Sequence, residues 1–147
     1  MRFGPVGLAD AQGAILAHAV TAGERTWRKG AVLSGEDVAA MARAGLDSVV
    51  AVTMEPGDVD ENAAAALVAA ALGGPGLEIR PAATGRANVH ALAAGVFRAD
   101  RAAVDAINAV DPAITLATLP DLASVAAGQM LATVKIVPFA VPGALAR

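Results

Sequence analysis

The sequence predicts an α+β fold: one compact domain of mixed short strands with about three helices, its strand order undetermined. The 147 residues fit one domain and are long enough to bury a core. Helical and extended patterns alternate irregularly, without a fixed repeat. The composition is 56% hydrophobic with three Phe and one Trp, so the core must be built from aliphatic side chains.

The first third of the chain is predicted to contain a short strand, an exposed strand pair and a capped helix. The strand covers 2–6, and the strand pair surrounds a turn at Lys29–Gly30, because glycine adopts the backbone angles of tight turns. Ser34 followed by Asp37 is typical of a helix N-terminus with reciprocal capping bonds. Gly45 is predicted to end this helix in a left-handed conformation.

The rest of the chain is predicted to contain two more helices among several strands. One helix follows an acidic turn, with Asp58 and Glu61 at capping spacing, and stops at 73–75 where Gly-Gly-Pro cannot extend it. Another begins at Asp100. Pro138 argues that the last strand lies partly at a sheet edge. The predicted strands are 48–54, 77–82, 95–99, 114–118 and 129–141.

The domain boundaries follow from the last strand. We expect one accessory domain over 1–141. Residues 142–147 show no pattern of a further element, so they are expected to be a tail or the start of a linker to a domain outside this chain.

The composition argues against several classes of protein. The net charge is −3 and the basic residues are scattered, so a nucleic-acid-binding face is not expected. Cysteine is absent, which excludes disulfides and thiol chemistry. The longest apolar runs are about ten residues, half of what a membrane helix needs. The N-terminus does not resemble a signal peptide. A cytoplasmic protein without membrane contact is expected.

The stretch from Thr84 to His90, Thr-Gly-Arg-Ala-Asn-Val-His, gathers polar groups within aliphatic sequence. On a strand, Arg86, Asn88 and His90 would point to one face, because side chains alternate with a period of two. Arginine suits a bidentate phosphate or carboxylate contact, and histidine can act as acid, base or ligand. Thr84, Arg86, Asn88 and His90 are therefore the candidate cofactor-binding residues. The alternative interpretation is a polar strand or loop exposed to water.

The acidic turn offers candidate metal ligands. Asp58, Asp60 and Glu61 carry carboxylates that could bind Mg²⁺. The favoured interpretation is helix capping, because carboxylates are stabilised by the free N–H groups of a first helical turn. His18 and His90 lie far apart in the sequence and form no zinc motif.

Motifs for catalysis are missing. The sequence contains no Gly-x-Ser-x-Gly elbow, phosphate loop or Gly-x-Gly-x-x-Gly pattern. Lys135 lies in an apolar strand, where the favoured interpretation is the outward side of an edge strand. Catalytic residues are therefore not assigned.

Several blocks of sequence carry a family resemblance. They are KGAVLSGEDVAAMARAGLDSVVAV at 29–52, EPGDVDENAAAALVAAAL at 55–72, ATLP at 117–120 and ATVKIVPFAV at 132–141. Together they resemble the N-terminal region of bacterial molybdopterin-binding proteins. That group is related to the molybdopterin molybdotransferases and to fusions with a molybdenum-cofactor cytidylyltransferase.

The resemblance implies an accessory role. In that family a later α/β domain holds the pterin with a Thr-Gly-Gly-x-Ser-type loop, and this chain has no such loop. The resemblance therefore implies a domain that shapes a cofactor pocket or mediates assembly, without catalysing a reaction alone. It implies molybdopterin or molybdenum cofactor as the ligand in the full-length context. The implied partners are a C-terminal molybdopterin-binding domain and, in a homo-oligomer, a second copy.

Two other functions stay open. The chain could be a small-molecule enzyme that uses Arg86 and His90 with a carboxylate of the acidic turn. It could also be a structural or oligomerisation module. Convergence of the candidate residues on a concave surface favours binding or catalysis, whereas an exposed aliphatic patch favours docking.

Overall fold

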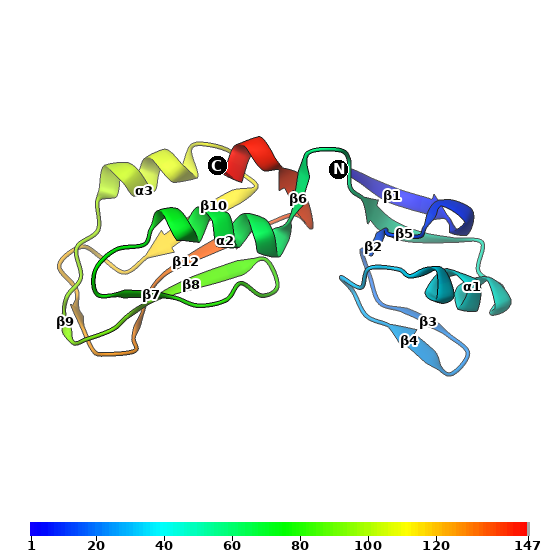
Figure 1. The fold of residues 1–147 in the computed structure, drawn as a ribbon, viewed down its shortest axis with the longest axis horizontal. Helices are drawn as coiled ribbons and strands as arrows, with labels where there is room; N and C mark the ends of the chain where they lie inside the picture. Colours follow the sequence, from blue (N-terminus) through cyan, green and yellow to red (C-terminus); the bar gives the residue numbers. More distant parts are fainter. Residues whose placement is uncertain (147) are drawn as a thin grey trace. The chain divides into compact units, whose positions relative to one another are not determined.

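A computed structural model describes residues 1–146, which divide into two compact units after Pro56 (Figure 1). The predicted α+β class of mixed short strands with three α-helices is confirmed. The helices are α1 (Gly35–Arg43), α2 (Glu61–Ala71) and α3 (Arg101–Asn108). Among the described residues, no helix is long and apolar enough to cross a membrane.

The first unit combines a three-stranded antiparallel sheet, a hairpin and helix α1. The sheet has the order β1-β5-β2, and β3 pairs with β4 in the hairpin. Leu16, Leu33 and Met41 are fully buried in the core of this unit. Its elements are β1 (Arg2–Gly7), the 3-10 helix η1 (Leu8–Asp10), β2 (Ile15–Leu16), β3 (Val20–Ala22), β4 (Arg25–Trp27) and β5 (Ser48–Thr53).

Helix α1 has the predicted ends. The Ser34 hydroxyl accepts a hydrogen bond from Asp37 N at 3.1 Å, and Asp37 Oδ2 accepts from Ser34 N at 3.0 Å, which completes a capping box. Gly45 follows the helix with a φ of 85°. The predicted strand pair around Lys29–Gly30 is wrong, because the hairpin reverses at 23–24 and Ala22 pairs with Arg25.

The second unit is a four-stranded antiparallel sheet of order β10-β12-β8-β7 with two helices on one face. Helix α2 packs on β8 and β12, and α3 packs on β10. Ala65, Val134 and Ile136 are fully buried between the helices and the sheet. The strands of this sheet are β7 (Leu77–Ile79), β8 (Arg86–Ala91), β10 (Ile114–Thr118) and β12 (Met130–Ile136).

Two small strand pairs complete the second unit. They are β6 (Asp58–Asp60) with β13 (Ala140–Pro142), and β9 (Gly95–Val96) with β11 (Ser124–Val125). The predicted strand 129–141 therefore splits into β12 and β13, because Pro138 lies in the break between them. An edge position for Lys135 is wrong, because β12 lies inside the sheet between β10 and β8.

The division of the chain differs from the predicted single domain over 1–141 with a tail at 142–147. The chain forms two compact units, and each unit has its own hydrophobic core. Pro142 ends β13, and Gly143–Ala146 form the 3-10 helix η2. Gly143 N donates to Gly57 O at 2.9 Å, and a Cβ on Gly143 would meet Val59 at 2.8 Å. Residues 142–146 are therefore packed against the second unit and do not form the tail or linker that the sequence predicted.

Candidate functional site

Thr84 and Gly85 form the two-residue turn that leads into β8. Ala83 and Arg86 exchange both backbone hydrogen bonds, at 2.9 and 3.0 Å. Thr84 has a φ of 50° and Gly85 a φ of 69°, the positive pair that a type I′ turn requires. A β-branched residue in this region is strained. The sequence left strand or loop undecided here, and the structure shows a turn followed by a strand.

Contacts from two other elements hold this turn. Gly85 N donates to Asn62 Oδ1 on α2 at 2.9 Å, and Lys135 Nζ donates to Thr84 O at 3.1 Å. A Cβ on Gly85 would lie 2.7 Å from Lys135 Nζ and 2.8 Å from Glu61 Oε2. Helix α2 and strand β12 therefore fix the position at which β8 begins.

Arg86, Asn88 and His90 lie on one face of β8, as the period of two predicts. Their neighbours Ala87 and Val89 are buried in the core under the helices, so these three residues lie on the face opposite the helices. Arg86 is exposed and Asn88 half-buried, while His90 is only 7% exposed. These three residues therefore become progressively more buried from Arg86 to His90.

Two residues of β12 extend this row across the sheet. Lys135 stands directly opposite Arg86, and Thr133 stands directly opposite Asn88. Residues paired in this way have their side chains on the same face. We call the set of Arg86, Asn88, His90, Thr133 and Lys135 the polar face.

Lys135 apart, the side chains of this face have polar atoms without partners within residues 1–146. His90 Nδ1 and Thr133 Oγ1 are buried and make no hydrogen bond with any residue that the structure describes. Within the described residues, the side chains of Arg86 and Asn88 take part in no hydrogen bond or ion pair. At the edge of the sheet, by contrast, Glu78 pairs with Arg80 at 3.3 Å.

The acidic turn caps helix α2. Asp60 is the N-cap, and its Oδ1 accepts from Asn62 N at 2.9 Å and Ala63 N at 3.0 Å. The cap is therefore Asp60 and not Asp58, which lies in β6. Glu61 is the first residue of the helix. Within the described chain, no three carboxylate or imidazole groups are arranged to hold a metal ion.

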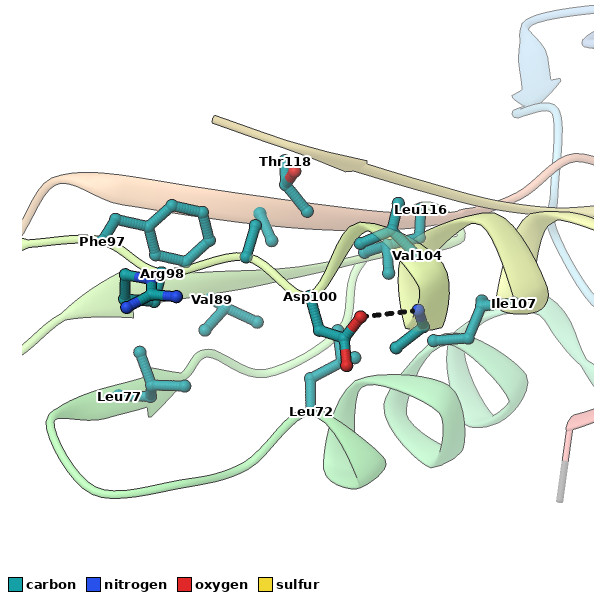
Figure 2. Close-up of a pocket in the computed structure, with 13 residues that line it drawn as sticks. Leu72, Leu77, Val89, Phe97, Arg98, Asp100, Val104, Ile107, Leu116 and Thr118 are labelled. Carbon is teal, nitrogen blue, oxygen red and sulfur yellow. Dashed lines mark hydrogen bonds between the residues drawn. The ribbon is translucent and has the colours of Figure 1, made fainter. Parts of the chain in front are cut away.

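A cavity of about 200 Å³ opens on the helix side of the same sheet (Figure 2). Leu72, which directly follows α2, lines it together with Val104 of α3, Leu116 of β10 and Phe97. The sequence predicted the helix beginning at Asp100 but not this cavity. Its formation depends on the spacing of two helices on a sheet, which no local pattern encodes.

Charged residues also line this cavity. They are Arg98 and Asp100, on the segment between β9 and α3. Arg98 Nε lies 3.4 Å from Asp121 Oδ1, which also accepts a hydrogen bond from Ala99 N at 2.9 Å. The Ala99 bond first, and then the Arg98 charge, lower the pKa of Asp121. Asp121 therefore stays ionised and holds the segment that carries Arg98.

Comparison with known families matches part of the first unit. A family model described as a domain of unknown function (DUF8806) matches residues 5–53, which lie in the first unit. No curated protein and no solved structure matches the chain. The polar face and the cavity both lie outside the matched residues.

Proposed function

We propose that this chain is an accessory domain in molybdopterin binding or molybdenum-cofactor handling, and that its polar face contacts the anionic part of the ligand. The domain would shape a cofactor pocket, or mediate assembly with a molybdopterin-binding domain or a second copy. It would not catalyse a reaction alone. The sequence blocks described above support the cofactor class. The cytoplasmic location expected from the sequence belongs to the same proposal.

The observation that carries the proposal is the pairing of Arg86 with Lys135. Like charges directly opposite each other on neighbouring strands destabilise a sheet, by an amount of order 0.2–1 kcal/mol. Lys135 has Glu61 near its ammonium group, across Gly85, whereas Arg86 has no acidic partner within residues 1–146. A bound phosphate or carboxylate would offset the repulsion and accept charge-assisted hydrogen bonds from the guanidinium.

The buried atoms without partners also support a ligand here. Leaving a buried donor or acceptor unsatisfied costs about 1–3 kcal/mol. His90 Nδ1 and Thr133 Oγ1 are two such unsatisfied atoms, and both belong to the polar face. Both atoms are closed to solvent, so a ligand with hydrogen-bonding groups, such as a pterin ring system, would satisfy them only if the side chains around them moved on binding.

Binding is favoured over catalysis by the surroundings of His90. A catalytic base needs a partner that orients its ring and a nucleophile within reach. Within residues 1–146 the imidazole has no hydrogen-bonded partner. Asp60 of the acidic turn is engaged in capping α2.

Calorimetric titration with a molybdopterin-type ligand tests the proposal. We expect Arg86→Gln to weaken binding by about 1–3 kcal/mol, the scale of a lost charged hydrogen bond. Arg101→Gln is the matched control, because Arg101 pairs with Asp105 on α3 and lies away from the polar face. Inorganic phosphate is the second titrant. Binding of phosphate alone would keep the anion site and reject the cofactor class, and no binding of either by the folded chain would reject both.

A further inference from the structure

The cavity beneath α3 lies on the opposite side of the sheet from the polar face and is independent of it. Its floor is made by Val89, Leu116 and Ala132 of the three strands β8, β10 and β12, and Phe97 and Leu72 close two of its sides. Figure 2 shows Leu72, Val89, Phe97 and Leu116 around a common space, with Asp100 beside the first turn of α3. The lining is mainly apolar.

Helix α3 leaves its apolar side partly uncovered at this cavity. Val104 and Ile107 are the large apolar residues on its inner side, and both are only half-buried. The helix is nevertheless fixed in place. Asn108 Nδ2 donates to Leu116 O at 2.9 Å, and Asn108 Oδ1 accepts from Leu116 N at 2.7 Å. The cavity is therefore bounded by an anchored helix.

The size of the cavity limits its ligand. A closed apolar cavity of about 150 Å³ accommodates benzene. At about 200 Å³, this partly open cavity has room for one aromatic ring or a branched alkyl group. Drug-sized ligands occupy pockets above about 300 Å³. The ligand therefore has a small apolar body.

The charged residues of the lining indicate which polar groups the ligand carries. Asp121 engages the Nε side of Arg98, and the two terminal guanidinium nitrogens have no hydrogen bond within residues 1–146. Asp100 Oδ1 accepts from Ala103 N at 3.1 Å, while its other carboxylate oxygen accepts no bond from the described residues. Arg98 is thus ion-paired with Asp121 but keeps donors for a ligand, and Asp100, two residues on, keeps one carboxylate oxygen as an acceptor.

We propose that this cavity binds a hydrophobic α-amino acid. The apolar side chain occupies the cavity, the carboxylate meets Arg98 and the ammonium group meets Asp100. The charges of the head group and of the lining are complementary. This site is separate from the polar face and does not depend on the function proposed above.

The test is calorimetric titration of the intact chain with L-phenylalanine and L-leucine. Three further titrants dissect the recognition: phenethylamine lacks the carboxylate, 3-phenylpropionate lacks the ammonium group, and glycine lacks the apolar body. We expect one of the two amino acids to bind at least about tenfold more tightly than each of these, because charged hydrogen bonds and apolar burial each contribute on that scale.

Matched variants locate the site. Ala103→Leu fills the cavity and should abolish binding, whereas Ala102→Leu changes a residue of the same helix that does not line the cavity and should not. Asp100→Asn keeps a side chain that caps helices well but removes the charge. It should weaken amino-acid binding by about 10- to 100-fold. Arg98→Gln should do the same, with Arg101→Gln as its control.

Three outcomes would overturn the proposal. The first is that neither amino acid binds to the folded chain. The second is that Ala102→Leu weakens binding as much as Ala103→Leu, which would move the site elsewhere. The third is that phenethylamine and 3-phenylpropionate bind as tightly as phenylalanine, which would reject a zwitterionic ligand. Arg86→Gln should leave amino-acid binding unchanged. A failure of the amino-acid proposal can therefore be told apart from a failure of the anion site at the polar face.

Discussion

The carboxylate of Asp37 links helix α1 to strand β4. It accepts hydrogen bonds from the Ser34 hydroxyl at 2.6 Å and from Trp27 Nε1 at 2.8 Å, and Arg25 Nη2 lies 2.6 Å away. These interactions, led by the Ser34 hydrogen bond, lower the pKa of Asp37 to about 2. The folded-state pKa lies below the ordinary value near 3.9, so the ionised carboxylate stabilises the folded first unit above about pH 4. That stabilisation is lost as the pH falls toward about 2.

We expect Asp37→Asn to reduce this acid dependence. The variant should be less stable near neutral pH, because Arg25 loses its partner, and its stability should change less between about pH 6 and about pH 3. Fluorescence of Trp27, the one tryptophan in the sequence, reports urea unfolding of this unit. Glu36→Gln is the control, because it neutralises an acidic residue in the same helical turn. An equal loss of stability on acidification in Asp37→Asn and the unmodified chain would contradict the assignment.

At the scale of elements, the Thr84–Gly85 turn sets where β8 begins. We expect Thr84→Asn to stabilise the second unit by about 1 kcal/mol, because Asn adopts a positive φ more readily than a β-branched residue. Gly85→Ala should destabilise it by about 1–2 kcal/mol or more, because the added Cβ is strained at φ 69° and would lie 2.9 Å from Ile136 O. Urea unfolding followed by circular dichroism measures both. Shifts of the same sign would contradict a type I′ turn.

At the scale of the whole molecule, the two units have separate cores and should unfold separately. Met41 is fully buried in the first core and Ile136 in the second. Met41→Ala and Ile136→Ala should each cost about 2–5 kcal/mol, because each leaves a cavity. We expect Met41→Ala to shift the transition seen by Trp27 fluorescence, and Ile136→Ala to leave it unchanged while shifting the transition seen by circular dichroism. A shift of the Trp27 fluorescence transition by Ile136→Ala would show one cooperative unit.

The sequence predicted several local features of the structure well. The shared face of Arg86, Asn88 and His90 follows from alternation along a strand once the strand exists. The capping box at Ser34 and the helix start at Asp100 follow from interactions within a few residues. The cap of α2 was placed at Asp58 and not at Asp60, because acidic residues two positions apart offer equivalent local patterns.

Features that depend on distant partners were not predictable. Nothing in the sequence near Thr133 indicates that it stands opposite Asn88, because that pairing is set by the register of β12 against β8. The interior position of β12 was missed for the same reason. The hairpin at 23–24 was missed because two Gly-containing turns compete within a short segment.

By itself the sequence determined the fold class, both ends of helix α1, the start of helix α3 and the common face of Arg86, Asn88 and His90. All of these rest on capping bonds, backbone angles and side-chain periodicity within a few residues. The tertiary structure decided the two-unit division, the like-charged pair of Arg86 and Lys135, and the cavity beneath α3. These features join residues far apart in the chain, and their geometry is set by how helices pack on a sheet and how strands align.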